Sequence, residues 1–175
     1  MILRFSIKLT ILILIVSCTQ PVDQKGDRGY HAKIGDTVGD INFTLTDNTT
    51  INLNQLKGKV IVLQFTASWC SVCRKEMPFL EEEVWQKYKN DDFILIGVDY
   101  NEPIEKVIAF KQKMKTTYPM AIDPDGSIFL KFSYKGSGVT RNVIINKDGK
   151  IAYLTRLFDR DEFDEMKEKI AELMK

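Results

Sequence analysis

Cys70 and Cys73 are the two side chains of this sequence best suited to chemistry. They lie in the stretch FTASWCSVCRKEMP, separated by two residues. The apolar run Val60–Phe65 precedes them and predicts a buried strand, while the residues that follow have the spacing of a helix. Cys70 should therefore lie at or near a helix N-terminus, where free N–H groups and the helix dipole favour an anion such as a thiolate.

Cys73 should lie about one helical turn after Cys70 and on the same face. From there its sulfur could attack a mixed disulfide formed on Cys70 and release the partner. The spacing therefore predicts a redox-active pair in which Cys70 is the nucleophile and Cys73 is the resolving thiol. A reaction of this type requires no added cofactor.

Other uses of the pair remain open from the sequence. A structural zinc site needs about four ligands, but the chain has no second CxxC motif, and its single His31 lies in a polar stretch. Two soft thiolates could bind copper, so a copper-binding or metallochaperone module is one alternative. A purely structural disulfide is another, although a loop this short at the start of a helix constrains little. We expect no bound metal.

The composition is that of one globular domain. The chain has 175 residues, of which 44% are hydrophobic and 28% are charged, and its net charge is +1. This length can bury a sizeable core, and these fractions are ordinary for a folded protein. No basic stripe stands without acidic neighbours, so we expect no nucleic-acid partner.

The N-terminus has the features of an export signal. Arg4 and Lys8 precede the apolar run Leu9–Val16, which is too short for a spanning helix of about 20 residues. The ending IVSC resembles a bacterial lipobox, which implies removal of the signal peptide, residues 1–17, and lipidation of Cys18. An exported protein meets oxidising surroundings, in which a cysteine pair can form a disulfide.

Residues 18–33 are then expected to be the lipidated cysteine and a flexible tether, because TQPVDQKGDRGYHAK is polar and has no periodicity. The folded domain is expected over residues 34–175. Its start, INFTLTDNTTINL, alternates apolar and polar residues around Asp47-Asn48, a pattern that predicts a β-hairpin. A second hairpin is expected around Asp148-Gly149.

The remaining elements predict an α/β fold. Strands at 60–65 and 93–100 should be parallel and joined by a right-handed crossover through the helix that follows Cys73, with a kink at Pro78. Further helices are expected at 103–115 and 159–175. This order predicts a sheet with helices on both faces.

The chain resembles the TlpA/ResA-like family of exported, membrane-tethered thiol–disulfide oxidoreductases. The resemblance extends from about Ile34 to the C-terminus and rests on LNQLKGKVIVLQFTASWCSVCRKEMPFL, YPMAIDPDG and NVIINKDGKI. It implies a thioredoxin-like fold, with a central mixed β-sheet flanked by helices on both faces and an N-terminal β-hairpin. It also implies that Cys70 and Cys73 form the redox-active disulfide.

The resemblance assigns roles to residues beside the cysteines. Glu76 has the position of a family carboxylate that helps to move protons between the cysteines, and a partly buried carboxylate has a raised pKa suited to proton exchange. Thioredoxin has a buried Asp six residues before its first cysteine, where this chain has Gln64, which cannot titrate. Trp69 matches the active-site Trp of the family and should pack beside Cys70.

The chain departs from the family at Thr140. An alignment on KDGKI places Thr140 where the family has a cis-proline that faces the first cysteine and helps to bind the substrate backbone. A cis bond before a residue other than proline costs about 2.5–4 kcal/mol, so a trans Val139–Thr140 bond is expected. Thr140 should still lie near Cys70, and the neighbouring Arg141 is a candidate for stabilising the thiolate.

The implied function is reduction of disulfides in exported proteins. The lipid anchor would hold the domain at a membrane of the bacterial cell envelope, facing the periplasm, and a membrane-linked thiol donor would return electrons to the pair. A thiol peroxidase is an alternative, since peroxiredoxins share the broad fold. Their motif places a Thr and a Pro, however, where this chain has Ala67 and Leu63.

Overall fold

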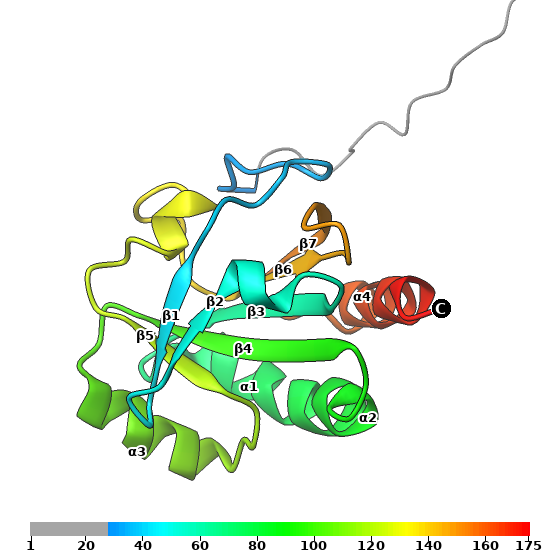
Figure 1. Cartoon of the computed structure of the whole chain (residues 1–175). Coiled ribbons are helices and arrows are strands. Elements are labelled where there is room, and N and C mark those ends of the chain that lie inside the picture. The colour runs from blue at the N-terminus through cyan, green and yellow to red at the C-terminus, as the bar shows by residue number, and fades with distance from the viewer. Residues whose placement is uncertain (1–27) are drawn as a thin grey trace, which may run out of the picture.

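The computed structural model describes residues 28–175 (Figure 1). Cys18, the predicted signal peptide and the first part of the predicted tether lie outside the described residues. Over residues 28–175, none of the helices combines the length and the apolar character that crossing a lipid bilayer would require.

A mixed sheet of seven strands forms the centre of the described chain, in the order β2-β1-β5-β4-β3-β6-β7. Strands β3, β4 and β5 are parallel, whereas β6 is antiparallel to β3, and β1 is antiparallel to β5. All residues of β3 are buried, which explains its continuous apolar run. The strands are β1 (Asn42–Leu45), β2 (Thr50–Asn52), β3 (Val60–Thr66), β4 (Phe93–Tyr100), β5 (Met120–Asp123), β6 (Arg141–Ile145) and β7 (Ile151–Arg156).

Both predicted hairpins are confirmed. Strands β1 and β2 pair antiparallel across a turn in which Asn48 has a φ of 64°. Strands β6 and β7 pair antiparallel across a turn in which Gly149 has a φ of 79°. Asn and Gly adopt positive φ at little cost, so these residue types fit the two turns.

The predicted helices are also present. The helix after the cysteines continues through Pro78, which lies inside α1, and then changes from α to wider π-helical turns. The helical segments are α1 (Ser71–Phe79), the π-helical η2 (Leu80–Trp85), α2 (Gln86–Tyr88), α3 (Ile104–Met114) and α4 (Arg160–Leu173), with short 3₁₀ helices η1 (Leu53–Leu56) and η3 (Phe129–Lys131).

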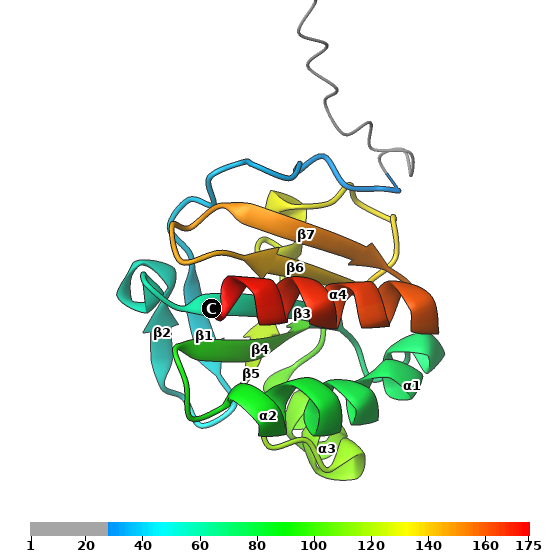
Figure 2. The ribbon, with the colours of Figure 1, turned by 90° about the vertical axis from the view of Figure 1, so that its right-hand side faces the viewer.

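The sheet separates two apolar cores. The α-helices share one face, where residues of α1, α3 and α4 pack with Val60 and Val62 of β3. Figure 2 shows these helices in front of the sheet. The two 3₁₀ helices contribute to the core of the other face, together with Phe65 and both cysteines. Helices therefore flank the sheet on both faces, and the predicted thioredoxin-like fold is confirmed.

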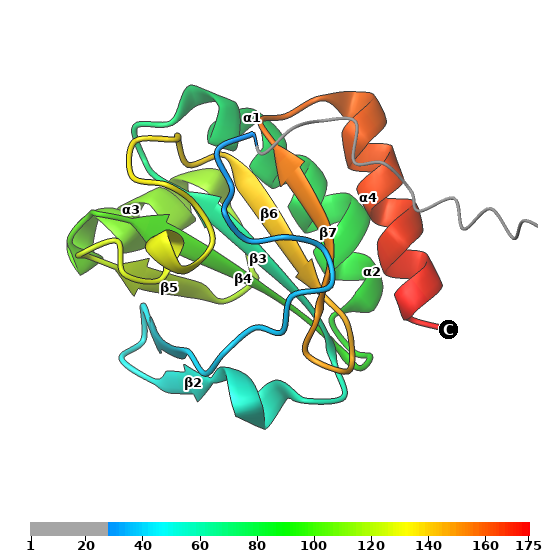
Figure 3. The ribbon, with the colours of Figure 1, turned by 90° about the horizontal axis from the view of Figure 1, so that it is seen from above.

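The N-terminal end of the described chain already packs against this fold. The main-chain N–H groups of His31 and Ala32 donate to the carbonyl of Phe132, and Tyr30 forms a bridge with Ser133. Figure 3 shows the segment, in blue, running over β6 and β7. Contacts with the domain thus begin before Ile34, within the stretch whose composition predicts a tether.

Candidate active site

Cys70 and Cys73 lie where the central strand β3 passes into helix α1. Cys70 is the N-cap residue of α1, and its Sγ accepts a hydrogen bond from the main-chain N–H of Cys73 at 3.1 Å. The two cysteines are joined as a disulfide, with their Cα atoms 5.3 Å apart. In the reduced state the same N–H group and the helix dipole would face a thiolate on Cys70, as the sequence predicts.

The two sulfur-bearing residues differ in access. Cys70 is 8% exposed, whereas Cys73 is fully buried. A partner approaching from solvent would therefore reach Cys70 first. Trp69 directly precedes Cys70 in the sequence and is 60% exposed, so most of the residue faces solvent. Its open face is available for contact with a partner.

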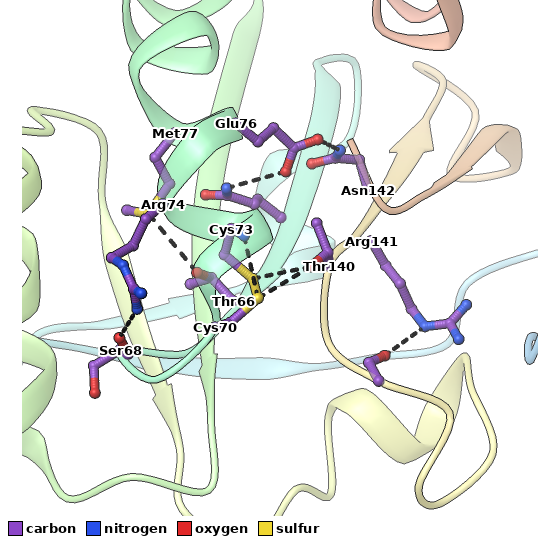
Figure 4. The surroundings of a disulfide bond; sticks show 12 residues. Thr66, Ser68, Cys70, Cys73, Arg74, Glu76, Met77, Thr140, Arg141 and Asn142 are labelled. Atoms are coloured by element: carbon purple, nitrogen blue, oxygen red, sulfur yellow. Dashed lines mark hydrogen bonds between the residues drawn. A yellow bond between two sulfur atoms is a disulfide. The ribbon is translucent and has the colours of Figure 1, made fainter. Parts of the chain in front are cut away.

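Thr140 lies directly against the disulfide, although it is distant in sequence. Its Oγ1 is 3.1 Å from the Sγ of Cys70 and 3.2 Å from the Sγ of Cys73 (Figure 4). Since a disulfide sulfur has no proton, only the hydroxyl can act as donor, and its one proton serves one of the two contacts at a time. None of the peptide bonds between residues 28 and 175 is cis, so Val139–Thr140 is trans as expected. The position therefore offers a hydroxyl where the family has a proline ring.

Glu76 is buried beneath the same helix. Its side chain is 1% exposed and accepts hydrogen bonds from the Asn142 amide at 2.7 Å and, more weakly, from the Gln64 amide at 3.4 Å. Burial raises the pKa of Glu76 to about 7, because the ionised form is desolvated, and the two amide donors only partly offset that effect. A carboxyl with this pKa can take up or release a proton near neutral pH.

Asn142 and Gln64 are the partners of Glu76 that the sequence does not reveal. They face each other across the β3–β6 pairing. The amide of Asn142 also donates to the hydroxyl of Thr155 at 2.9 Å, and the amide oxygen of Gln64 accepts from the hydroxyl of Tyr118 at 2.8 Å. The only available signal is the presence of polar residues within two otherwise apolar strands, which favours buried, hydrogen-bonded positions.

A second buried carboxylate supports the loop before Cys70. Glu102 accepts hydrogen bonds from the main-chain N–H of Ser68 at 2.5 Å and from its hydroxyl at 2.7 Å, while Arg74 donates to the carbonyl of Ser68 at 2.7 Å. Glu102 follows β4 and Ser68 follows β3, so the ends of neighbouring parallel strands bring them together. These contacts fix the main chain just ahead of the disulfide.

Asp99 lies beside Glu102 and is fully buried, and no donor among the described residues reaches either of its carboxyl oxygens. Burial, reinforced by the Glu102 carboxylate, raises the pKa of Asp99 to about 8. Burial and the neighbouring carboxylate thus both favour the protonated form of Asp99.

Arg141 does not contact the sulfur atoms. Its guanidinium points away from the disulfide (Figure 4) and donates to the main-chain carbonyls of Gly138, Ser137 and Arg28. The geometry thus places Thr140 and Glu76 at the cysteines and separates Arg141 from them. No three His, Cys, Asp or Glu side chains converge into a metal-binding group anywhere in the described part of the chain.

Known proteins with related sequences are thiol–disulfide oxidoreductases named ResA. The protein from Bacillus thuringiensis subsp. konkukian is 35% identical over 112 residues, which are 63% of this chain and 63% of the relative. The protein from Bacillus subtilis strain 168 is 29% identical over 112 residues, or 63% of this chain and 61% of the relative. The alignments therefore span less than two thirds of either ResA protein.

Solved structures give a longer match. A candidate protein disulfide isomerase from Bacteroides thetaiotaomicron superposes with a TM-score of 0.81 at 50% identity, over 83% of this chain and 92% of that chain. A candidate thiol:disulfide interchange protein DsbE from Chlorobium tepidum superposes with a TM-score of 0.74 over 82% of this chain and 99% of that chain, but at 22% identity this likeness concerns the fold alone. The Redoxin family profile matches residues 33–170, and the chain therefore belongs to the Redoxin family.

Proposed function

We propose that this protein is a thiol–disulfide oxidoreductase that acts through Cys70 and Cys73. The observation that supports the proposal best is the asymmetry of the pair at the start of α1. Cys70 is within reach of solvent and receives an N–H bond from the helix, whereas Cys73 is fully buried next to it. An accessible sulfur with a buried second sulfur at its side is the arrangement that two-step disulfide exchange requires.

The reaction would proceed as two exchanges. In the first, the Cys70 thiolate attacks one sulfur of a substrate disulfide, which forms a mixed disulfide and expels the other substrate sulfur as a thiolate. In the second, the Cys73 thiolate attacks the Sγ of Cys70 and expels the remaining substrate sulfur. The substrate gains two electrons and two protons, and Cys70 and Cys73 become the disulfide seen in the structure.

Glu76 is the group we assign to proton exchange in the second step. Cys73 must lose its proton before it attacks, and its surroundings exclude water. A buried carboxyl on the same helix, with a pKa of about 7, can accept a proton near neutral pH. Trp69 would contact the substrate, and the Thr140 hydroxyl would donate to the sulfur that is charged.

The direction and the setting of the reaction belong to the same proposal. The resemblance to exported reductases supports a role in reducing disulfides of exported proteins, with electrons supplied by a membrane-linked thiol donor. The apolar run before Cys18 and the ending IVSC support export and attachment through a lipid to a membrane of the bacterial cell envelope, with the domain facing periplasmic substrates.

The decisive measurement is the reduction potential of the Cys70/Cys73 pair in glutathione and dithiothreitol buffers. A potential near or below about −270 mV, the value of thioredoxin, is expected of a reductase. A potential near about −120 mV, the value of a strong oxidant, would reverse the proposed direction. A pair that does not exchange with either buffer would refute the activity itself.

A trapping experiment tests the order of attack. Cys73→Ser should accumulate a mixed disulfide with a peptide disulfide, because the second step is blocked. Cys70→Ser, the matched control, should accumulate none, since the remaining sulfur is buried. Equal trapping by both variants would contradict the assignment of Cys70 as the nucleophile.

A further inference from the structure

The loop that leads to Thr140 has two glycines and no proline, and its internal hydrogen bonds run from the N–H and hydroxyl of Ser137 to the carbonyl of Tyr134. Gly136 and Gly138 both have a φ of 81°, and no proline ring restricts the chain at Thr140. Yet Thr140 is positioned closely enough for one oxygen to contact both sulfurs, and its carbonyl accepts a hydrogen bond from the N–H of Leu157 at 2.9 Å. Contacts from outside the loop add to its own hydrogen bonds.

Arg141, the first residue of β6, supplies three bonds to this region. Its Nε donates to the carbonyl of Gly138 at 2.9 Å, and its Nη2 donates to the carbonyl of Ser137 at 2.8 Å. Its Nη1 donates to the carbonyl of Arg28 at 3.0 Å. The side chain is fully buried, which is rare for an arginine. The planar guanidinium thus joins the Thr140 loop to the N-terminal segment.

The N-terminal segment closes over the guanidinium from the other side. The Tyr30 ring lies over Arg141 with the guanidinium carbon 4.4 Å from the ring centroid. The Tyr30 hydroxyl donates to the carbonyl of Thr155 at 2.7 Å and contacts the carbonyl of Asn142 at 3.3 Å. Burial raises the pKa of Tyr30, so the hydroxyl stays protonated and able to donate.

Gly29 makes this close packing possible. A Cβ atom at Gly29 would lie 2.6 Å from Nη2 of Arg141 and 2.6 Å from the Cβ of Ser137, and the residue has a φ of 81°. Only glycine fits that space and that backbone conformation. Arg156 adds a further bond to the carbonyl of Ser137, at 2.9 Å from its Nη2. The loop is therefore held at its carbonyls by two arginines and covered by the N-terminal segment.

We propose that Arg141 and the segment Arg28–Tyr30 form a clamp that holds the Ser137–Thr140 loop, and thereby positions the Thr140 hydroxyl at the two cysteine sulfurs. This inference rests on the proposed thiol–disulfide chemistry. Arg141 and Tyr30 are positioning residues in it, because neither contacts a sulfur. The segment that precedes the Redoxin match, residues 28–32, becomes part of the active-site apparatus.

The test compares single and double variants of the purified protein. Thr140→Val removes the hydroxyl and keeps the branched shape, while Arg141→Lys keeps the charge and removes the planar donor set. Each should shift the equilibrium with glutathione about tenfold toward the Cys70–Cys73 disulfide, because a thiolate that loses a hydrogen bond is less stable. A tenfold change is about 30 mV in reduction potential. The pH midpoint for alkylation of Cys70 should rise in both variants.

The double variant separates positioning from general damage. If Arg141 acts through Thr140, Arg141→Lys should cause no further shift in a Thr140→Val background. Tyr30→Phe keeps the ring and removes the hydroxyl, so it should shift the equilibrium in the same direction by a smaller factor, again only when Thr140 is present. The matched control is Arg160→Lys, because Arg160 is a surface arginine that pairs with Glu83 and Asp164. This variant should leave the equilibrium unchanged.

Two outcomes would overturn the clamp. One is an unchanged equilibrium in Arg141→Lys and Tyr30→Phe while Thr140→Val shifts it. The other is full additivity of the Arg141 and Thr140 effects. Failure of the proposed function is distinguishable, since in that case the unsubstituted protein would not exchange with glutathione at all. If Arg141→Lys does not fold, Tyr30→Phe takes its place: no shift in Tyr30→Phe alone, or full additivity with Thr140→Val, would overturn the clamp.

Discussion

Replacement of Glu76 by Gln should change how stability depends on pH. In the unfolded chain this carboxyl loses its proton near its ordinary pKa of 4.5, whereas in the folded protein it retains the proton up to about pH 7. The folded state therefore binds more protons between these two values. The free energy of unfolding must fall as the pH rises through that window.

The size of the effect follows from the two pKa values. The interval from 4.5 to about 7 corresponds to about 3 kcal/mol of unfolding free energy. Most of it, about 2–3 kcal/mol, is lost between pH 5 and pH 8. No discount for solvent screening is needed, because Glu76 is 1% exposed. The amide that replaces the carboxyl in Glu76→Gln does not titrate, so the variant should escape this loss.

Urea denaturation of the oxidised protein at pH 5, 6, 7 and 8 measures the difference. Wild type and Glu76→Gln share every other titrating group, Asp99 included, so subtraction of the two curves isolates Glu76. Glu82→Gln, which removes an exposed carboxylate from η2, the helical continuation of α1, should follow the wild-type curve. Parallel curves for wild type and Glu76→Gln would refute the conclusion that Glu76 is a buried titrating group.

The same variant tests the proton-exchange role independently of stability. If Glu76 accepts the proton of Cys73, the rate at which a mixed disulfide on Cys70 resolves should depend on a group titrating near pH 7. Glu76→Gln should remove that dependence. A stability difference without a change in this rate profile would leave Glu76 buried and titrating, and would rule out its role as a proton acceptor.

Three further substitutions probe the surroundings of the site. Tyr118→Phe should lower the unfolding free energy by about 1–2 kcal/mol, since Gln64 loses a buried donor; an unchanged urea midpoint would contradict this. Arg28→Ala should cost about 1–2 kcal/mol through loss of its contacts with Glu162, whereas a neutral result would mean that the N-terminal contacts add no stability. Asp99→Asn should lose less unfolding free energy than wild type between pH 5 and pH 9, because burial raises the pKa of Asp99 to about 8 and the amide does not titrate. Equal losses in the two proteins would contradict a raised pKa of Asp99.

Local patterns predicted the fold and the cysteine pair well. The apolar run of β3, the two hairpin turns and the helical spacing after Cys73 are all features of neighbouring residues, and each appears in the structure. Strand β5 is harder to predict, because it is short and directly follows Pro119. Its strand conformation depends on hydrogen bonds to the neighbouring strands β1 and β4 rather than on a pattern in its own sequence.

The contacts between distant residues could not be predicted in the same way. The segment containing Tyr30 is polar and aperiodic, so its composition indicates a tether. Its burial depends on Arg141, which is far away in the sequence. Arg141 in turn was a candidate for contact with a thiolate because it adjoins Thr140. Successive side chains of an extended chain point in opposite directions. Because the Thr140 side chain points toward the sulfurs, the Arg141 side chain points away from them.

The Thr140 hydroxyl has one proton to share between two sulfurs, at 3.1 Å and 3.2 Å from its oxygen. It can donate to only one of them at a time. Before attack, we expect it to turn to Cys70, where the negative charge resides. Once Cys70 is bonded to a partner, that charge is gone, and rotation about one bond brings the proton to Cys73. Rotation of this one hydroxyl would then determine which of the two sulfurs is stabilised as a thiolate, and thereby the order of the two exchanges.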